Sequence, residues 1–136
     1  MRIFKTKWLA RFARHEGIAD ESLRDAIDRA ECGLIDADLG GGLIKQRVAR
    51  QGKGRSGGYR MVIAYRAEGR AVFLSAFAKK QRENIEPEEL VELREVGLNW
   101  LNASVQKIAL AIEDGALQEV DLDEQKDTWQ VERCHS

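Results

Sequence analysis

The sequence predicts a single α+β domain with two N-terminal helices, an antiparallel β-meander in the middle and a long C-terminal helix. Apolar residues recur at helical spacing before residue 33 and after residue 87, whereas residues 43–77 carry the period of two that is typical of strands. The chain has 136 residues, 43% of them hydrophobic, and a domain usually holds roughly 100–200 residues. We therefore expect one domain over residues 1–120, followed by an acidic, flexible tail over residues 121–136.

The N-terminal part is predicted to hold a short strand and two amphipathic helices. Residues 2–5 favour the strand, and residues 6–16 favour a helix that Gly17 ends. Asp20 is a good N-cap for the second helix, which is expected to end at Gly33. The apolar residues of these helices expected to pack in the core are Trp8, Leu9, Phe12, Ala13, Leu23, Ala26, Ile27 and Ala30.

Three strands are predicted in the middle of the chain. They span residues 43–50, 59–66 and 70–77, with a glycine-rich loop over residues 52–58 and a tight turn at Glu68-Gly69. Alternation along the second strand directs one set of side chains to a core face and leaves Arg60 and Arg66 on the other. The set expected to face the core is Tyr59, Met61, Ile63 and Tyr65.

A long helix is predicted to follow the meander. Pro87 suits the first helical position, and the glutamates beside it lie at the positive end of the helix dipole. The helical period continues to about Gly115, and Gly97 is a candidate position for a kink or a break.

Positive charge is concentrated in the first two thirds of the chain. Residues 1–82 hold 18 Lys or Arg and 9 Asp or Glu, whereas residues 83–136 hold 4 and 14. Within residues 43–82, eleven cations accompany a single carboxylate, Glu68. Such a block is typical of a polyanion-binding surface; the alternative is a solvated face whose repulsion the acidic C-terminal third offsets.

Several kinds of site are absent from the sequence. No set of His, Cys, Asp or Glu has the spacing of a zinc site, and Gly52-Lys53 lacks the rest of a Walker motif. Asp36 and Asp38 lie near glycines and are expected to serve a turn rather than to bind metal ions. We therefore expect no metal and no cofactor.

The sequence also predicts a cytoplasmic protein. No apolar run approaches the ~18 residues of a membrane span, and the N-terminus lacks the pattern of a signal peptide. Cys32 and Cys134 form no CxxC pair, and in a reducing compartment we expect both to be free thiols.

The cations of the middle region are predicted to form one phosphate-binding nest. Taken alone, residues 52–58 read as a flexible hairpin connection. Their glycines would also let backbone N–H groups approach an anion, with Lys53, Arg55 and Ser56 as further donors. Alternation puts Lys45 and Arg47 on one face of their strand. The remaining cations at strand ends are Arg60, Lys79, Lys80 and Arg82, and all of these could converge on one concave face of the sheet.

Two segments of the chain resemble a known family. GGLIKQRVARQGKGRSGGYRMVIAYR (41–66) and RAVFLSAFAKKQRENI (70–85) are similar to the RelE-like toxins of the HigB branch of bacterial type II toxin–antitoxin systems, in the RelE/ParE superfamily. The resemblance covers about residues 2–120. It implies a RelE-like fold and a toxin that cleaves mRNA, commonly in the ribosomal A site, until a cognate helix-turn-helix antitoxin neutralises it.

The resemblance also implies a mechanism and residue roles. Cleavage in the family is independent of metal, and the 2′-hydroxyl attacks the adjacent phosphorus to leave a 2′,3′-cyclic phosphate. The sequence departs from many relatives because residues 83–120 contain no Tyr or His for proton transfer. The roles carry over as catalytic for Arg60, Lys45, Lys79 and Lys80, and as RNA-binding for Arg47, Lys53, Arg55, Ser56 and Arg82.

Physical chemistry gives Arg60 the clearest role. The transition state of phosphodiester cleavage gains negative charge, and the planar fork of a guanidinium fits phosphate oxygens. The general base stays open among Lys45, Lys53, Lys79 and Lys80, since neighbouring cations favour the neutral form of a lysine. Two other functions remain open: a ParE-like toxin that binds gyrase without cleaving RNA, and a non-enzymatic nucleic-acid-binding module.

Overall fold

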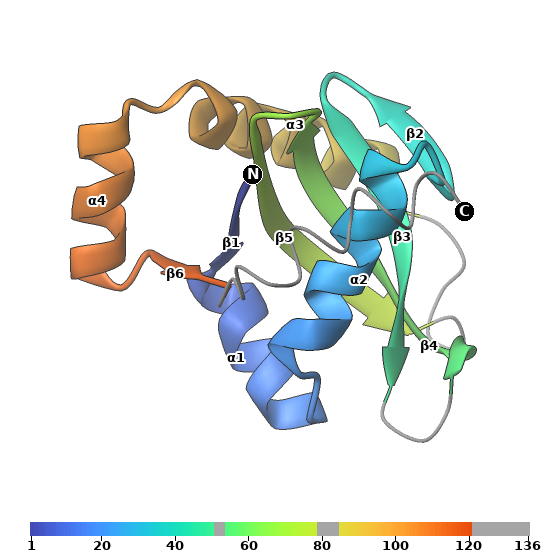
Figure 1. The fold of residues 1–136 in the computed structure, drawn as a ribbon. Coiled ribbons are helices and arrows are strands. Elements are labelled where there is room, and N and C mark those ends of the chain that lie inside the picture. The colour runs from blue at the N-terminus through green and yellow to red at the C-terminus, as the bar shows by residue number, and fades with distance from the viewer. Residues whose placement is uncertain (51–53, 79–84, 121–136) are drawn as a thin grey trace.

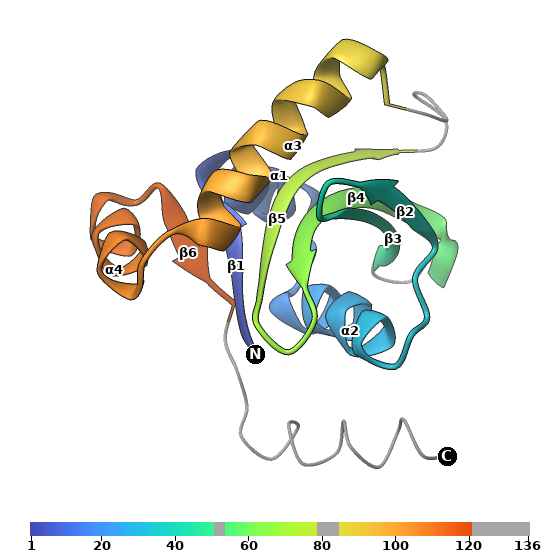
Figure 2. The same cartoon turned by 90° about the horizontal axis from the view of Figure 1, so that it is seen from above.

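A six-stranded sheet, with strands in the order β2-β3-β4-β5-β1-β6, runs through the molecule between two pairs of helices (Figures 1 and 2). The structure is a computed structural model that describes residues 1–50, 54–78 and 85–120, without the side chains of residues 50 and 54–57. The predicted α+β class is confirmed, as are the two N-terminal helices and the antiparallel meander.

The N-terminal elements follow the predicted order. β1 (Arg2–Thr6) leads directly into α1 (Lys7–Glu16), which the Thr6 hydroxyl caps by accepting the Leu9 N–H at 3.2 Å and which ends at Gly17 with φ of 69°. α2 (Asp20–Glu31) begins one residue earlier than predicted, because Ala19 occupies the N-cap position without a side-chain cap.

Asp20 is therefore not the predicted N-cap. Its carboxylate instead accepts a hydrogen bond from Lys5 Nζ at 2.6 Å. Lys5 is only 8% exposed, and a buried ammonium is costly without a paired carboxylate. Trp8 also departs from its prediction, since it is 50% exposed rather than packed in the core.

The meander consists of β3 (Leu43–Arg50), β4 (Gly54–Arg66) and β5 (Arg70–Ala78). The prediction of a loop over residues 52–58 is wrong for residues 54–58, because β4 already pairs with β3 from Arg50 opposite Gly54. Gly54, Gly57 and Gly58 belong to the extended strand β4. The pairing of β4 with β3 therefore continues past residues 59–66, the segment that the sequence predicted as a strand.

Two short edge strands complete the sheet. β2 (Ala37–Gly40) pairs antiparallel with β3, and β6 (Leu117–Glu119) pairs antiparallel with β1. β1 in turn pairs parallel with β5, which places the N-terminal strand inside the sheet. The sequence did not predict β2 or β6, since strands of four and three residues carry too few positions to show a period.

The two faces of the sheet bury separate apolar clusters. α1 and α2 cover one face, and α3 (Pro87–Asn102) and α4 (Val105–Asp114) belong to the other (Figure 2). Tyr59 and Tyr65 lie on the α1–α2 side, as predicted, and donate hydrogen bonds to Glu16 and Glu31. Burial and the Glu31 carboxylate raise the pKa of Tyr65 well above its usual value. Because side chains alternate along a strand, Arg60 lies on the opposite side, with the α3–α4 cluster.

The C-terminal helical region is split, and the break is not at Gly97. The prediction of one long helix is wrong because the chain turns at Ala103, and the Ser104 hydroxyl then caps α4 by accepting the Lys107 N–H at 3.0 Å. Gly97 lies inside α3 and is buried against the sheet. A Cβ there would stand 3.0 Å from Leu43 Cδ2 and 3.1 Å from Ala64 Cβ, so glycine lets the helix approach the strands closely.

Replacing Gly97 with leucine is expected to destabilise the protein by about 1–3 kcal/mol, as overpacking of a core does. Leucine is the better helix former, so a loss of stability reports packing and not helix propensity. Urea unfolding measures it, with Leu98→Ala on the exposed side of α3 as the control. A Gly97→Leu protein as stable as the wild type would contradict this packing.

Two arginines of the basic region support the fold rather than a ligand. Arg66 donates to the Leu101 carbonyl at 3.1 Å, and Arg70 donates to the carbonyls of Trp100 at 2.7 Å and Ala103 at 2.8 Å. The last carbonyls of a helix lack partners within it, and these guanidinium groups supply them. Arg66 and Arg70 therefore fix the C-terminal end of α3 on the β4–β5 hairpin.

The turn between β2 and β3 is held in a similar way. The Arg94 guanidinium of α3 donates to the Leu39 carbonyl. Its stem lies so close to the turn that a Cβ on Gly41, whose φ is 62°, would meet Arg94 Cδ at 3.0 Å. Glycine at Gly41 therefore satisfies both the left-handed backbone and the contact with α3.

Two other sequence expectations are tested by the described residues. Cys32 is disulfide-bonded, so the prediction of a free thiol is wrong for this residue. Among the helices of the described ranges, none combines the length and the apolar character that crossing a membrane requires.

Candidate functional site

Three cations meet in one open pocket on the β3–β4 hairpin. Lys45, Arg47 and Arg60 line it together with Asp36, and its volume is about 210 Å³. Arg47 and Arg60 are direct partners across the two strands, and Lys45 lies two residues before Arg47. Opposed residues of an antiparallel pair project from the same face, as do residues two apart, so the three side chains share one side of the sheet.

The pocket lies beyond the area that α3 covers. α3 runs along the β5 side of the sheet (Figure 2), and the apolar cluster beneath it includes Leu43 and Val62. Past these residues the same face carries Lys45 and Arg60, which are partly exposed, and the exposed Arg47. The apolar core therefore gives way to a cationic surface along the same two strands.

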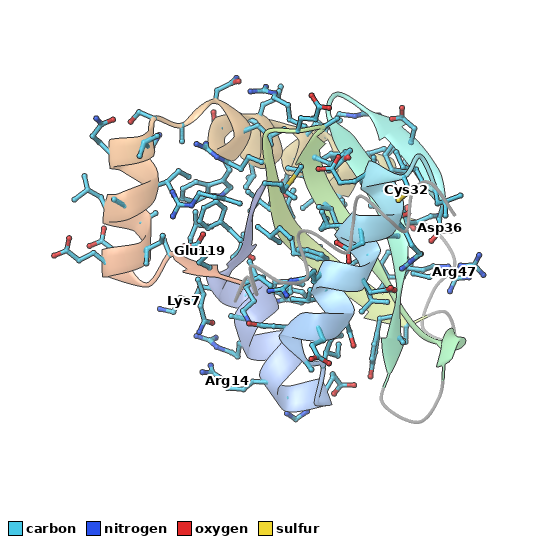
Figure 3. All side chains as sticks on the ribbon, viewed as in Figure 1. Lys7, Arg14, Cys32, Asp36, Arg47 and Glu119 are labelled. Carbon is cyan, nitrogen blue, oxygen red and sulfur yellow. The ribbon has the colours of Figure 1, made fainter. Side chains whose placement is uncertain are left out.

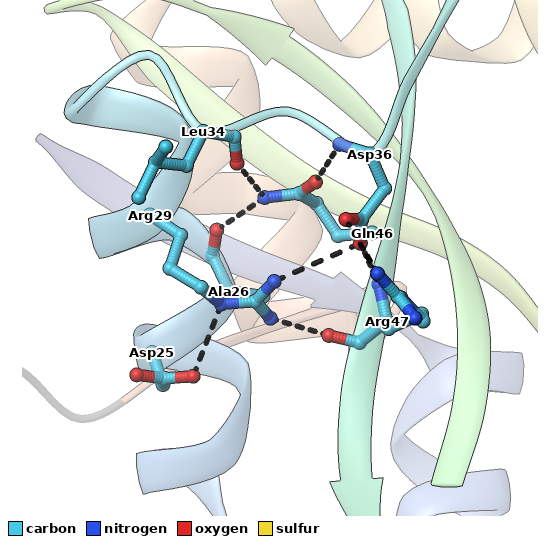
Figure 4. A network of polar contacts seen from close by, with 7 residues as sticks. All are labelled: Asp25, Ala26, Arg29, Leu34, Asp36, Gln46 and Arg47. Carbon is cyan, nitrogen blue, oxygen red and sulfur yellow. Dashed lines mark hydrogen bonds and ion pairs between the residues drawn. The ribbon is translucent and has the colours of Figure 1, made fainter. Parts of the chain in front are cut away.

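A buried glutamine fixes this part of β3 from the other face. Gln46 is fully buried, and its amide nitrogen donates to the carbonyls of Ala26 at 2.9 Å and Leu34 at 3.1 Å (Figure 4). Its amide oxygen accepts the Asp36 N–H at 2.7 Å. One side chain thus ties β3 to α2 and to the segment that leads into β2.

Asp36 and Arg29 hold Arg47 from both sides of its peptide backbone. Asp36 Oδ2 accepts the Arg47 N–H at 2.7 Å, and Asp36 Oδ1 lies 3.5 Å from the Arg47 guanidinium (Figure 4). Arg29 donates to the Arg47 carbonyl, and its guanidinium lies 3.7 Å from Asp36 Oδ2. Asp25 accepts a hydrogen bond from Arg29 at 3.2 Å, so the arginine is itself oriented.

The structure brings together three of the predicted site residues: Lys45, Arg47 and Arg60. The sequence predicted that Lys45 and Arg47 would share a face, and this is confirmed. Arg55 and Ser56 belong to β4, but their side chains lie outside what the structure describes. The predicted residues that lie wholly outside the described ranges are Lys53, Lys79, Lys80 and Arg82.

Sequence reasoning missed Asp36 and Gln46. Asp36 was expected to serve a turn, which is wrong, since its carboxylate lines the pocket and binds Arg47. Asp38 does serve one, accepting the Gly40 N–H at 2.8 Å. Gln46 carried a usable signal, because a polar residue at an inward strand position between Ile44 and Val48 needs buried partners.

The pocket offers donors and charge rather than metal ligands. Over the described ranges, no group of three His, Cys, Asp or Glu side chains could hold a metal ion. Arg47 and Arg60 present guanidinium groups that match the oxygens of a phosphate, and Lys45 adds a third cation. The arrangement suits a phosphodiester bound in a shallow, cationic pocket.

A comparison with known families identifies the family of the chain. The family described as the RelE toxin of the RelE / RelB toxin-antitoxin system matches residues 1–120. The chain belongs to the RelE toxin family. It is thus a toxin of a toxin–antitoxin system, and a RelE-family toxin has an antitoxin as its partner. No curated protein matches the chain.

Proposed function

We propose that this RelE-family toxin is a metal-independent endoribonuclease of the HigB type that cleaves mRNA. The observation that carries the proposal is the pocket in which Lys45, Arg47 and Arg60 converge. We assign the activity to residues 1–120, the range that the RelE family matches, and not to the acidic segment that follows. The proposed partners are mRNA on the ribosome and a helix-turn-helix antitoxin, and the proposed location is the cytoplasm.

The proposed reaction is an internal transfer of the phosphodiester. The 2′-oxygen forms a bond to the adjacent phosphorus, and the bond from phosphorus to the 5′-oxygen of the next nucleotide breaks. The products are a 2′,3′-cyclic phosphate and a 5′-hydroxyl. One proton leaves the 2′-hydroxyl and one is delivered to the departing 5′-oxygen, so no water or metal is consumed in this step.

The two arginines are assigned to the phosphate. Negative charge accumulates on the non-bridging oxygens in the transition state, so fixed guanidinium groups stabilise it more than the ground state. Arg60 is assigned as the main clamp. Arg47, whose backbone and guanidinium are both held by Asp36, is assigned to bind and orient the RNA.

Proton transfer is assigned to lysine. Lys45 lines the pocket beside both arginines and is our candidate for the group that accepts the 2′-hydroxyl proton. Lys79 and Lys80 remain candidates for the second transfer, and Lys53, Arg55, Ser56 and Arg82 for contacts with the RNA backbone.

A cleavage assay tests the proposal. The purified toxin is incubated with a defined mRNA alone in EDTA and, separately, with the same mRNA on translating ribosomes in magnesium buffer, and both product ends are mapped. We expect cuts that leave 2′,3′-cyclic phosphates, and the Lys107→Ala protein, altered on exposed α4, should cut equally well. Intact mRNA under all conditions would contradict the proposal, and inhibition of gyrase supercoiling by the same preparation would favour a ParE-like toxin.

A further inference from the structure

α1 carries a row of cations outside the pocket. Lys7, Arg11 and Arg14 are exposed, and at positions i, i+4 and i+7 they follow one line along the helix. Within the part of the chain that the structure describes, no carboxylate pairs with any of them. At a rise of 1.5 Å per residue, the row is about 10 Å long.

An aromatic platform adjoins this row. Trp8 is 50% exposed and stacks on Phe12 at a centroid distance of 5.3 Å and an interplanar angle of 12°. Phe12 in turn meets the ring of Tyr59 edge-on at 5.2 Å. The indole is therefore oriented before any partner arrives, while half of its surface stays open to solvent.

The row is separate from the pocket. α1 packs on the face of the sheet opposite to Lys45 and Arg60, and Figure 3 shows Lys7 and Arg14 on α1, far across the molecule from Arg47. Glu16, the acidic residue of α1, accepts a hydrogen bond from Tyr59 and lies outside the row. A phosphate bound in the pocket leaves these α1 cations unoccupied.

We propose that α1 is a second RNA-binding surface, in which Lys7, Arg11 and Arg14 bind backbone phosphates and Trp8 stacks on an unpaired base. Cations beside an exposed aromatic ring are the combination that binds single-stranded RNA, since every base has a face to stack. This surface goes beyond the proposed cleavage site, because it holds RNA away from the scissile phosphate.

Binding of a non-cleavable RNA tests the surface. The probe is a fluorescent single-stranded oligonucleotide with 2′-deoxy sugars at every linkage that the toxin can cut, titrated at several salt concentrations. Neutralising all three cations (K7Q, R11Q and R14Q together) should weaken binding and lower the salt slope by about 2, at roughly 0.7 per phosphate contact. Trp8→Ala should weaken binding about tenfold, and Trp8→Phe should retain most of it.

Controls separate this proposal from the previous one. Lys107→Gln should bind like the wild type, and charge-retaining K7R and R14K should keep the full salt slope. If the triple variant keeps the wild-type affinity and slope, or loses only binding to a poly-glutamate peptide, the RNA surface is ruled out. If the wild-type toxin cleaves mRNA but the α1 variants bind RNA normally, only the α1 surface is ruled out. If binding depends on α1 but the wild-type toxin cleaves no mRNA, only the proposed endoribonuclease activity is ruled out.

Discussion

Replacing Arg60 with alanine is expected to lower the rate of mRNA cleavage by about 10²–10³, the effect of removing one preorganised donor from a developing oxyanion. Arg60 lines the pocket and stands directly opposite Arg47, so in the proposed complex both guanidinium groups would face the scissile phosphate. Single-turnover cleavage at saturating enzyme measures the effect on chemistry apart from binding.

Two matched variants make this test specific. Arg60→Lys keeps the charge but loses the planar fork, so it should fall between alanine and the wild type. Lys107→Ala removes a cation from exposed α4 and should leave the rate unchanged. If Arg60→Ala cleaves at nearly the wild-type rate, Arg60 is not the phosphate clamp.

Asp36→Asn is expected to lower kcat about tenfold or more while it tightens binding of the RNA. Asparagine can still accept the Arg47 N–H, but it loses the charge that attracts the Arg47 and Arg29 guanidinium groups. A misplaced catalytic or binding group can cost up to about 10²-fold in rate. Removing the carboxylate strengthens the attraction of the pocket for phosphate by roughly 1 kcal/mol, which corresponds to a KM about fivefold lower.

The opposite signs of these two changes distinguish positioning from a general structural role. Asp38→Asn removes the same charge two residues away, where the carboxylate serves the Gly40 turn, and should change both constants little. A parallel loss of kcat and RNA affinity in Asp36→Asn, together with a lower melting temperature, would show that Asp36 only supports the fold.

Much of the fold could be predicted where period and turn chemistry agree. The apolar stripe of α1 and Gly17 after it predict where this helix lies and where it ends, and the Thr6 cap starts the helix at Lys7, one residue later than predicted. The β4–β5 turn likewise follows from Glu68-Gly69, with Glu68 at φ of 59°. The split between α3 and α4 could not be predicted, because Gly97 serves contact with the sheet and not a break.

The candidate site could be predicted only in part. Side-chain alternation along β3 places Lys45 and Arg47 on one face, and the pairing of consecutive strands brings Arg60 beside them. The alternation and the order of the strands can both be predicted from short stretches of sequence. The roles of Asp36 and Gln46 depend on contacts between elements. Gln46 of β3 donates to the Ala26 carbonyl of α2 and accepts the Asp36 N–H, and these contacts exist only when β3 packs against α2. The count of cations in residues 43–82 also overestimated the number available to a ligand, since Arg66 and Arg70 donate to the carbonyls at the end of α3.

The most direct test of the central claim follows each arginine side chain by NMR while a non-cleavable mRNA fragment is added. If Arg47 and Arg60 form one phosphate pocket, their Nε–Hε signals should shift together and saturate with a single dissociation constant. Arg66 and Arg70, on the same sheet but bound to α3, should stay in place. Shifts of Arg66 and Arg70 as large as those of Arg47 and Arg60, or no shift at Arg60, would contradict the account.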